Sequence, residues 1–194
     1  MPSTAASAPY TWDDFVALEE DDLRELIDGE LVEVEVPTHV HERMVALFCF
    51  FLEAWARKNG GGRTFASGAK VRVSDSRGVM PDVQFYRSGN EPSGSGGRGR
   101  PDIAIEILSS SSVRYDRVVK LAYYASIGVP EYWLVDTASR TVERLVLDGE
   151  RYAIAGALGG DEVLTTSSFE GLAIPLADLW RAADEARALD VEGR

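Results

Sequence analysis

A single acidic residue, Glu106, stands inside an apolar run that follows Pro101-Asp102. The run from Ile103 to Leu108 is rich in β-branched and aliphatic residues, which predicts a strand buried on both faces. Because side chains alternate along a strand, Glu106 shares its face with Ala104. A carboxylate in this position costs several kcal/mol unless it is protonated, paired with a cation or bound to a metal ion. Glu106 is therefore expected to have a partner from elsewhere in the chain.

Two residues are natural partners for it. Asp82 follows Met80-Pro81 upstream, and Lys120 lies downstream in a predicted helix. Two acids and a lysine at one buried site are residue types suited to divalent-metal chemistry on a phosphodiester. Since Mg²⁺ prefers oxygen ligands and keeps several waters, we expect Asp82, Glu106 and the Ile107 carbonyl to bind Mg²⁺ or Mn²⁺. The metal would activate water, and Lys120 would orient the nucleophile or balance the developing charge.

Each of these residues also has a structural interpretation. Asp82 is compatible with a strand-entry turn, and Glu106 with a structural ion pair to Arg114 or Lys120. Lys120 is also four residues from Asp116, the spacing of a solvated helical ion pair. A protease- or glycosidase-like use of the two acids would leave Lys120 unexplained. The joint occurrence of the three residues favours the metal site.

Two neighbouring positions limit this site. Asp102 is four residues from Glu106, about 13 Å along a strand, so the two cannot share one ion. Asp102 is expected to cap the strand entrance or to support the site from further out. A D/E-x-K triplet would require a lysine at position 108, where the chain has Leu108, so the lysine role passes to Lys120.

Other polar residues near these positions are candidates for substrate contacts. Ser109–Ser112 precedes a predicted helix, so the serines are expected to cap it and could hold a phosphate there. His41 is a candidate helix cap, substrate contact or proton carrier. We expect His41, Arg114 and Arg117 to contact the substrate. Tyr123-Tyr124 is expected in the core, with a tyrosine lining the site as the alternative.

The charge is unevenly distributed along the chain, whose formal net charge is −12. Residues 1–56 hold 13 acids and 2 Lys/Arg, and residues 121–194 hold 13 acids and 6 Lys/Arg. Residues 57–120 hold 6 acids and 12 Lys/Arg, a net of +6. This basic third contains the three candidate catalytic residues, which predicts a positive surface for a phosphate-bearing substrate. Chance segregation on a solvated surface is the alternative.

The composition is that of a globular domain with a sizeable core, 45% hydrophobic and 27% charged over 194 residues. One cysteine, Cys49, excludes an internal disulfide and favours a reducing, cytoplasmic compartment. No signal peptide is recognisable, and the most apolar stretch, residues 44–55, is too short to span a membrane.

Periodicity and turn residues predict an α/β domain with a mixed central sheet flanked by helices. Residues 1–9 are expected to form a flexible tail, and residues 10–190 a single domain. The expected elements are a short helix capped by Thr11, a hairpin at Asp28-Gly29 with a second strand over 31–36, a helix over 41–58, strands over 64–73 and 79–86, a mobile loop over 88–100, the strand 103–108, a helix over 113–127, a strand over 131–136, a hairpin of 141–147 with 152–155, and a helix over 176–189.

Several short motifs occur in an order that resembles a known family, the bacterial Uma-type restriction endonucleases of the PD-(D/E)XK nuclease superfamily. The resemblance covers about residues 10–180, and its most specific part is the block from Glu106 to Asp136. The motifs are Tyr10-Thr11, Glu25-Leu26-Ile27-Asp28-Gly29-Glu30, His41, Pro81-Asp82-Val83, Pro101-Asp102, Glu106-Ile107-Leu108-Ser109, Asp116, Lys120, Tyr124, Gly128-Val129 and Glu131-Tyr132-Trp133-Leu134-Val135-Asp136.

The resemblance implies a restriction-endonuclease-like core, Mg²⁺ dependence and DNA as substrate. It matches the superfamily's aspartate to Asp82, its metal-binding glutamate to Glu106 and its displaced lysine to Lys120. A further acid from the N-terminal part is often recruited, and Glu25 and Glu42 are both candidates. A homodimer would allow one site per DNA strand. The alternatives are an inactive nuclease fold that binds or regulates, and a metal-dependent hydrolase of a small phosphate or nucleotide.

Overall fold

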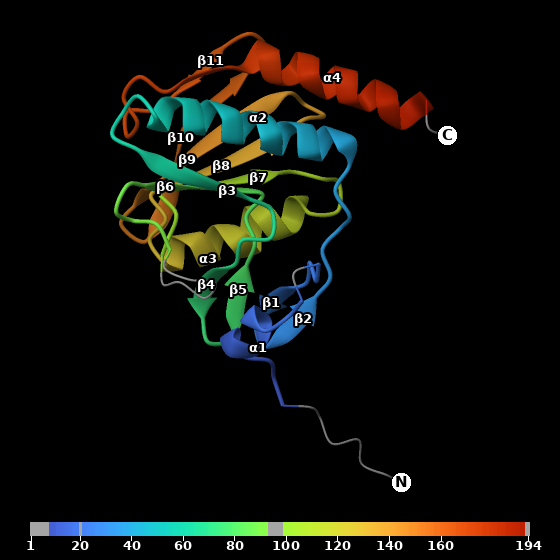
Figure 1. Ribbon diagram of the computed structural model, residues 1–194, viewed down its shortest axis with the longest axis vertical. Coiled ribbons are helices and arrows are strands. Elements are labelled where there is room, and N and C mark those ends of the chain that lie inside the picture. Colours follow the sequence, from blue (N-terminus) through green and yellow to red (C-terminus); the bar gives the residue numbers. More distant parts are fainter. Residues whose placement is uncertain (1–7, 20, 93–98, 193–194) are drawn as a thin grey trace.

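The computed structural model describes residues 8–19, 21–92 and 99–192. Its centre is a six-stranded mixed sheet with helices on both faces (Figure 1). The strand order is β10-β9-β8-β7-β6-β3, and β7 and β8 are the parallel pair. The strands are β3 (Gly62–Ala66), β6 (Val83–Arg87), β7 (Ile103–Ile107), β8 (Glu131–Asp136), β9 (Thr141–Asp148) and β10 (Arg151–Gly159). This architecture confirms the predicted fold class.

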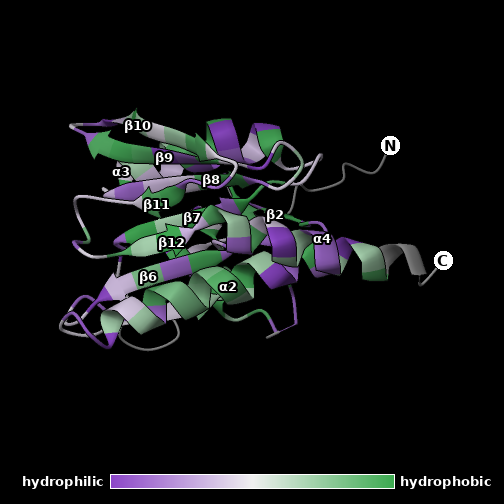
Figure 2. Cartoon of the chain, turned by 90° about the horizontal axis from the view of Figure 1, so that it is seen from above, coloured by the Kyte–Doolittle hydropathy of each residue, from purple (hydrophilic) through white to green (hydrophobic). Residues whose placement is uncertain are grey.

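Two long helices, α2 (His39–Ala56) and α4 (Leu176–Glu192), lie together over one face of this sheet (Figures 1 and 2). Their apolar stripes pack against the odd-numbered side chains of β7 and against Trp133 of β8. A two-stranded hairpin of β11 (Val163–Thr165) and β12 (Ala173–Pro175) precedes α4. Burying aromatic and aliphatic side chains in this layer supplies the main hydrophobic stabilisation.

The opposite face of the sheet is covered by a helix and by a second, smaller sheet. The helix contains a π-helical segment, η1 (Tyr115–Lys120), and continues as α3 (Leu121–Ser126). The small sheet has the order β2-β1-β5-β4, and the short helix α1 (Trp12–Val16) packs on it. Its strands are β1 (Glu25–Ile27), β2 (Glu30–Val32), β4 (Val71–Ser74) and β5 (Arg77–Val79).

Glu106 faces this second layer, as alternation along the strand predicts. The buried neighbours on its side include Ala104 and Leu108, whereas Ile103 and Ile105 belong to the core under α2. The predicted hairpin at Asp28-Gly29 is also confirmed.

The prediction of two long strands over 64–73 and 79–86 was wrong, because each is divided between the two sheets. The first breaks at a turn containing Gly68, whose φ of +98° suits glycine. The second breaks at Pro81, which has no N–H to donate to a strand partner. Asp82 follows directly, so the break places its carboxylate between the two sheets.

Two other predicted elements differ in detail. The strand expected over 31–36 ends at Val32, and residues 33–38 run on without a strand partner to the start of α2. The helix expected over 113–127 is present, but its first turns are π-helical over Tyr115–Lys120. The tail expected over 1–9 falls largely outside the described residues, and so do residues 93–98 of the glycine- and serine-rich loop expected over 88–100. The described residues of that loop, 88–92 and 99–100, form no helix or strand.

Candidate active site

A cavity of about 720 Å³ is lined by residues of both sheets and by the segments that connect them. Its floor holds Asp82, Glu106 and Lys120. The segment 33–38 and the serine turn 109–112 form part of its walls. The three candidate catalytic residues therefore meet at one opening, although 38 positions separate the first from the last.

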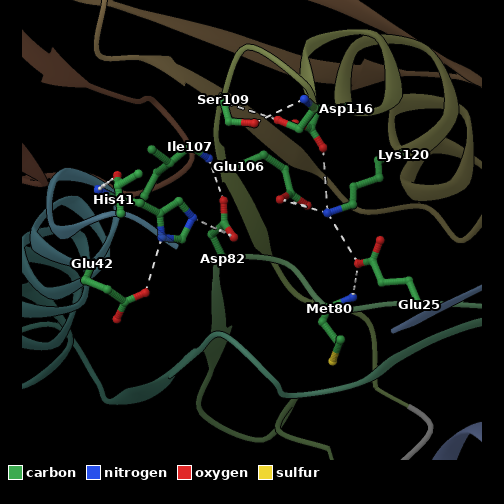
Figure 3. Close-up of polar contacts among 12 residues, drawn as sticks. Glu25, His41, Glu42, Met80, Asp82, Glu106, Ile107, Ser109, Asp116 and Lys120 are labelled. Carbon is green, nitrogen blue, oxygen red and sulfur yellow. Dashed lines mark hydrogen bonds and ion pairs between the residues drawn. The ribbon is translucent and has the colours of Figure 1, made fainter. Parts of the chain in front are cut away.

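Lys120 lies among three buried carboxylates (Figure 3). Its Nζ atom is 3.0 Å from Glu106 Oε2, 3.3 Å from Glu25 Oε1 and 3.7 Å from Asp116 Oδ1. Burial alone would lower the pKa of Lys120, but the surrounding carboxylates raise it well above its ordinary value. Lys120 is thus a fixed cation, and the alternative interpretation, a solvated ion pair with Asp116, does not hold because both residues are buried.

Asp116 and Lys120 both lie on the π-helical segment. The Leu121 N–H donates to the Asp116 carbonyl five residues back, which widens the turn. The same carbonyl accepts a hydrogen bond from the Tyr132 hydroxyl at 3.0 Å. Single π-helical turns are frequent at functional sites, and this one directs an acid and a lysine toward Glu106.

Asp82 is fixed by two hydrogen bonds from different elements. Its Oδ2 atom accepts the Ile107 backbone N–H at 2.7 Å, and its Oδ1 atom lies 3.1 Å from His41 Nε2. His41 Nδ1 is 3.3 Å from Glu42 Oε1. Burial alone would lower the pKa of His41, but Asp82 and Glu42 raise it above its ordinary value. Thr38, and not His41, caps α2, because its side chain accepts the His41 N–H.

Glu106 has a protein partner at each of its carboxylate oxygens. Oε1 accepts a hydrogen bond of 2.6 Å from the Tyr124 hydroxyl, and Oε2 faces Lys120. Burial raises the pKa of Glu106 well above its ordinary value, an effect that Lys120 opposes. Burial likewise raises the pKa of Tyr124 well above its ordinary value, so its phenol stays a donor. The carboxylate is therefore held in one orientation at the cavity.

The donor set fits a hard divalent cation. Four carboxyl groups lie near one lysine and one histidine here, so acidic side chains outnumber basic ones. The buried Oε2 atom of Glu25 has no hydrogen-bond partner, which is costly without a cation or water. Across the described ranges, no three Asp, Glu, His or Cys side chains converge as a metal-binding group. An ion at Asp82 and Glu106 would therefore need backbone carbonyls and water as further ligands, as Mg²⁺ commonly has.

Several predicted residues lie outside this cavity. Arg114 is exposed, and Arg117 forms a two-bond ion pair of 2.8 Å with Glu143. Neither lines the cavity, so their expected contact with substrate has no support from their positions. Asp102 accepts hydrogen bonds from the Arg87 N–H and from Asn90, which confirms that it caps the strand entrance.

The positive surface predicted for residues 57–120 does not form at the cavity. Lys120 is the one Lys or Arg of the described part of 57–120 that lines the cavity. Others pair elsewhere, such as Arg72 with Asp75 and Arg77 with Asp28. A positive third of the sequence did not become a positive surface at the site, because neighbours in the sequence point in different directions in the fold.

The sequence analysis left the role of two site residues open, Glu25 and Tyr124. Glu25, rather than Glu42, reaches Lys120, and it also accepts the Met80 N–H at 2.6 Å. Its position between the charged Arg24 and the apolar Leu26 at the start of a hairpin was the only available sequence signal. Tyr124 was expected in the core, where it lies, but its hydroxyl also reaches Glu106.

The comparisons with known proteins identify the family and the fold. A family model with the description "Putative restriction endonuclease", Uma2, matches residues 12–177. The chain belongs to the Uma2 family. This confirms the resemblance seen in the sequence, and the Uma2 match includes Glu25, Asp82, Glu106 and Lys120. No curated protein matches the chain.

A solved structure similar to this Uma2 chain is described as a putative nuclease belonging to DUF820 from Anabaena variabilis ATCC 29413. The two share 20% sequence identity with a TM-score of 0.75, and the match covers 90% of this chain and 99% of the other. At this identity the likeness establishes the fold. Among the described helices, none has the length and apolar character needed to cross a membrane.

Proposed function

We propose that this protein is a metal-dependent endonuclease that hydrolyses phosphodiester bonds of DNA. The observation that carries the proposal is the meeting of Asp82, Glu106 and Lys120 at one cavity. Membership of the Uma2 family, whose description reads "Putative restriction endonuclease", supports the reaction class. The unpartnered Glu25 Oε2 atom and the excess of carboxylates support a cation at the site.

In this proposal Asp82, Glu106 and the Ile107 carbonyl would hold Mg²⁺ or Mn²⁺. When bound, such an ion supplies an acidified water and positive charge at the phosphate. Lys120 keeps a permanent positive charge 3.0 Å from Glu106, which favours anionic oxygens nearby. Tyr124 holds the orientation of Glu106 through a 2.6 Å hydrogen bond, and His41 holds Asp82.

The test combines nicking of supercoiled plasmid with calorimetric titration of Mg²⁺ and Mn²⁺. We expect Asp82→Asn and Glu106→Gln each to abolish nicking and to weaken metal binding while the fold survives. Lys120→Ala should lower turnover more than metal affinity. Asp102→Asn, directly before the strand that carries Glu106, is the matched control and should retain activity. Full activity in either carboxylate variant would overturn the site assignment.

A second candidate is a metal-dependent hydrolase of a small phosphate or nucleotide. The observation that favours it is the cavity itself, whose 720 Å³ lies in the range of small-ligand sites, with Glu33 and Glu35 in its wall. Hydrolysis of bis(p-nitrophenyl) phosphate or of a nucleotide without nicking of DNA would support this candidate. Absence of any metal binding would instead indicate an inactive fold with a binding or regulatory role.

We also propose that the protein acts as a homodimer in the cytoplasm. A two-fold pair supplies one centre for each strand of a duplex, and the single free thiol, Cys49, is compatible with a reducing compartment. Light scattering of the purified protein, alone and with duplex DNA, measures the mass of the species. A monomer in both conditions would overturn the proposed assembly.

A further inference from the structure

The serine turn that follows Glu106 is in contact with a carboxylate from a distant segment. The Ser111 hydroxyl donates a hydrogen bond to Glu35 Oε2. The Ser109 hydroxyl lies 3.0 Å from that of Ser111, so the two hydroxyls form one chain that ends on the carboxylate. Hydrogen bonds from Ser111 and Ser109 lower the pKa of Glu35, so this group is an anion at neutral pH. The serine turn therefore already holds a negatively charged group.

Hydrogen bonds within the serine turn, residues 109–112, fix its backbone. The Ser109 N–H donates to Ser112 Oγ at 3.0 Å, and the Ser112 N–H donates to Ser109 Oγ at 3.1 Å. These reciprocal bonds fix the backbone between β7 and the helix that carries Lys120. The serines line the same cavity as Asp82 and Glu106. An anion on the turn would thus lie beside the candidate catalytic residues.

Glu35 belongs to the segment 33–38, which joins the small sheet to α2 and lines the cavity. Residues 33–36 are exposed, and no strand pairs with them within the described part of the chain. The contact with Ser111 is a link between this segment and the serine turn. A single exposed hydrogen bond of this kind is easily exchanged for one to another anion.

We propose that Ser109 and Ser111 form a phosphate-binding subsite of the cavity and that Glu35 occupies it as an internal competitor. Hydroxyl donors suit phosphate oxygens as well as carboxylate oxygens. A phosphate group of the substrate would displace Glu35 and release the segment 33–38 from the turn. This deepens the proposed function and rests on it only for the identity of the phosphate-bearing ligand.

The test uses inorganic phosphate as probe, followed by the backbone amide NMR signals of Ser109–Ser112 in the full chain. If Glu35 occupies the subsite about nine-tenths of the time, its removal raises the apparent affinity about tenfold. We therefore expect Glu35→Gln to lower the apparent Kd for phosphate by about that factor. Since Glu35 is exposed, the variant is expected to fold.

The matched control is Glu33→Gln, which removes the same charge from the same segment and cavity wall but makes no contact with the serine turn. Its phosphate affinity should change less than about twofold, because screened charges at this exposure have small effects. An equal gain in both variants would mean that charge alone is responsible and would overturn the proposal. Adding Ser111→Ala to Glu35→Gln should remove the gain. If Ser111→Ala alone gave the full gain, the link would be real but the serines would not bind phosphate.

A second arm separates this inference from the proposed function. Plasmid nicking by Glu35→Gln should show a lower KM for DNA than nicking by the unchanged chain, with kcat similar. Tighter phosphate binding without any nicking would sustain the subsite and overturn the nuclease proposal. Nicking with neither a lower KM nor tighter phosphate binding would overturn the subsite and leave the nuclease proposal intact.

Discussion

Tyr124 contributes to the candidate site through a single buried hydrogen bond to Glu106. Tyr124→Phe removes the donor and leaves a buried carboxylate oxygen unsatisfied, which typically costs about 1–3 kcal/mol. We expect a loss of stability of this size together with weaker Mn²⁺ binding, because Glu106 loses its fixed orientation. Chemical denaturation and calorimetry measure the two effects.

The matched control is Tyr132→Phe, which removes a buried phenol that donates to the Asp116 backbone carbonyl instead. It should lower stability comparably and leave metal affinity nearly unchanged. Equal effects of the two variants on metal binding would show that Tyr124 has no specific role in orienting Glu106.

The raised pKa values of Glu106 and Asp116 predict a pH dependence of folding. Burial raises both above the ordinary values of 4.5 and 3.8, so the native state binds more protons than the unfolded state in this range. The free energy of unfolding should therefore fall as pH rises above about 4.5 toward the folded pKa values. Glu106→Gln should flatten this slope, measured by urea denaturation from pH 4.5 to 8 without metal.

The exposed Glu30 offers a control for this slope, because Glu30→Gln changes a carboxyl that water reaches in both states. Its slope should match that of the unchanged chain. A slope of opposite sign, with stability rising through this range, would show that Glu106 is stabilised as an anion by Lys120 more than burial penalises it.

Residue types and their spacing in the sequence predicted the three central residues of the site. They did not identify the side chains that surround these three. Asp82, Glu106 and Lys120 were found because a buried carboxylate requires compensation, and strand alternation gave its face. Glu25 was one of two candidates, since no local pattern tells which distant acid reaches a lysine. Tyr124 was expected in the core, with a place at the site only as the alternative, because a sequence does not show where a hydroxyl points.

At the scale of elements, the small sheet positions Glu25 and depends on close packing with α1. A Cβ atom at Gly78 would lie 2.7 Å from two ring atoms of Phe15 and 2.8 Å from Trp12. We therefore expect Gly78→Ala to push α1 away and to cost about 1–3 kcal/mol. Gly156→Ala is the control, since its new Cβ would meet nothing closer than 3.5 Å. Thermal or urea denaturation compares the two, and equal stabilities would contradict this packing.

The strands that were predicted wrongly, over 64–73 and 79–86, are those whose residues pass from one sheet to the other. Apolar alternation continues across the turn at Gly68 and across Pro81, so periodicity alone predicted unbroken strands. The small sheet has only three or four residues per strand, too few for a clear pattern. The long helices and the strands 103–107 and 131–136 carry strong patterns and were predicted close to their observed bounds.

At the scale of the whole molecule, the distribution of charge constrains how DNA could bind. The chain carries a net charge of −12, and within the described part of the basic third, residues 57–120, only Lys120 lines the cavity. Among the described residues, Lys120, Arg187 and His41 are the cationic groups that line the cavity. With so few cationic side chains, the cavity can contact few DNA phosphates. The affinity for DNA should therefore depend on the metal ion rather than on a basic surface.

A shallow salt dependence of DNA binding follows from this charge distribution. Each phosphate neutralised by a basic side chain contributes about −0.9 to the slope of log K against log salt. With Lys120 and Arg187 as the permanent cations of the cavity, we expect a slope no steeper than about −2. Fluorescence anisotropy of a labelled duplex with Glu106→Gln, from about 50 to 200 mM KCl, measures it without cleavage. A slope near −6 would require about seven phosphate contacts and would place the DNA on a basic surface outside this cavity, where Arg114 is exposed.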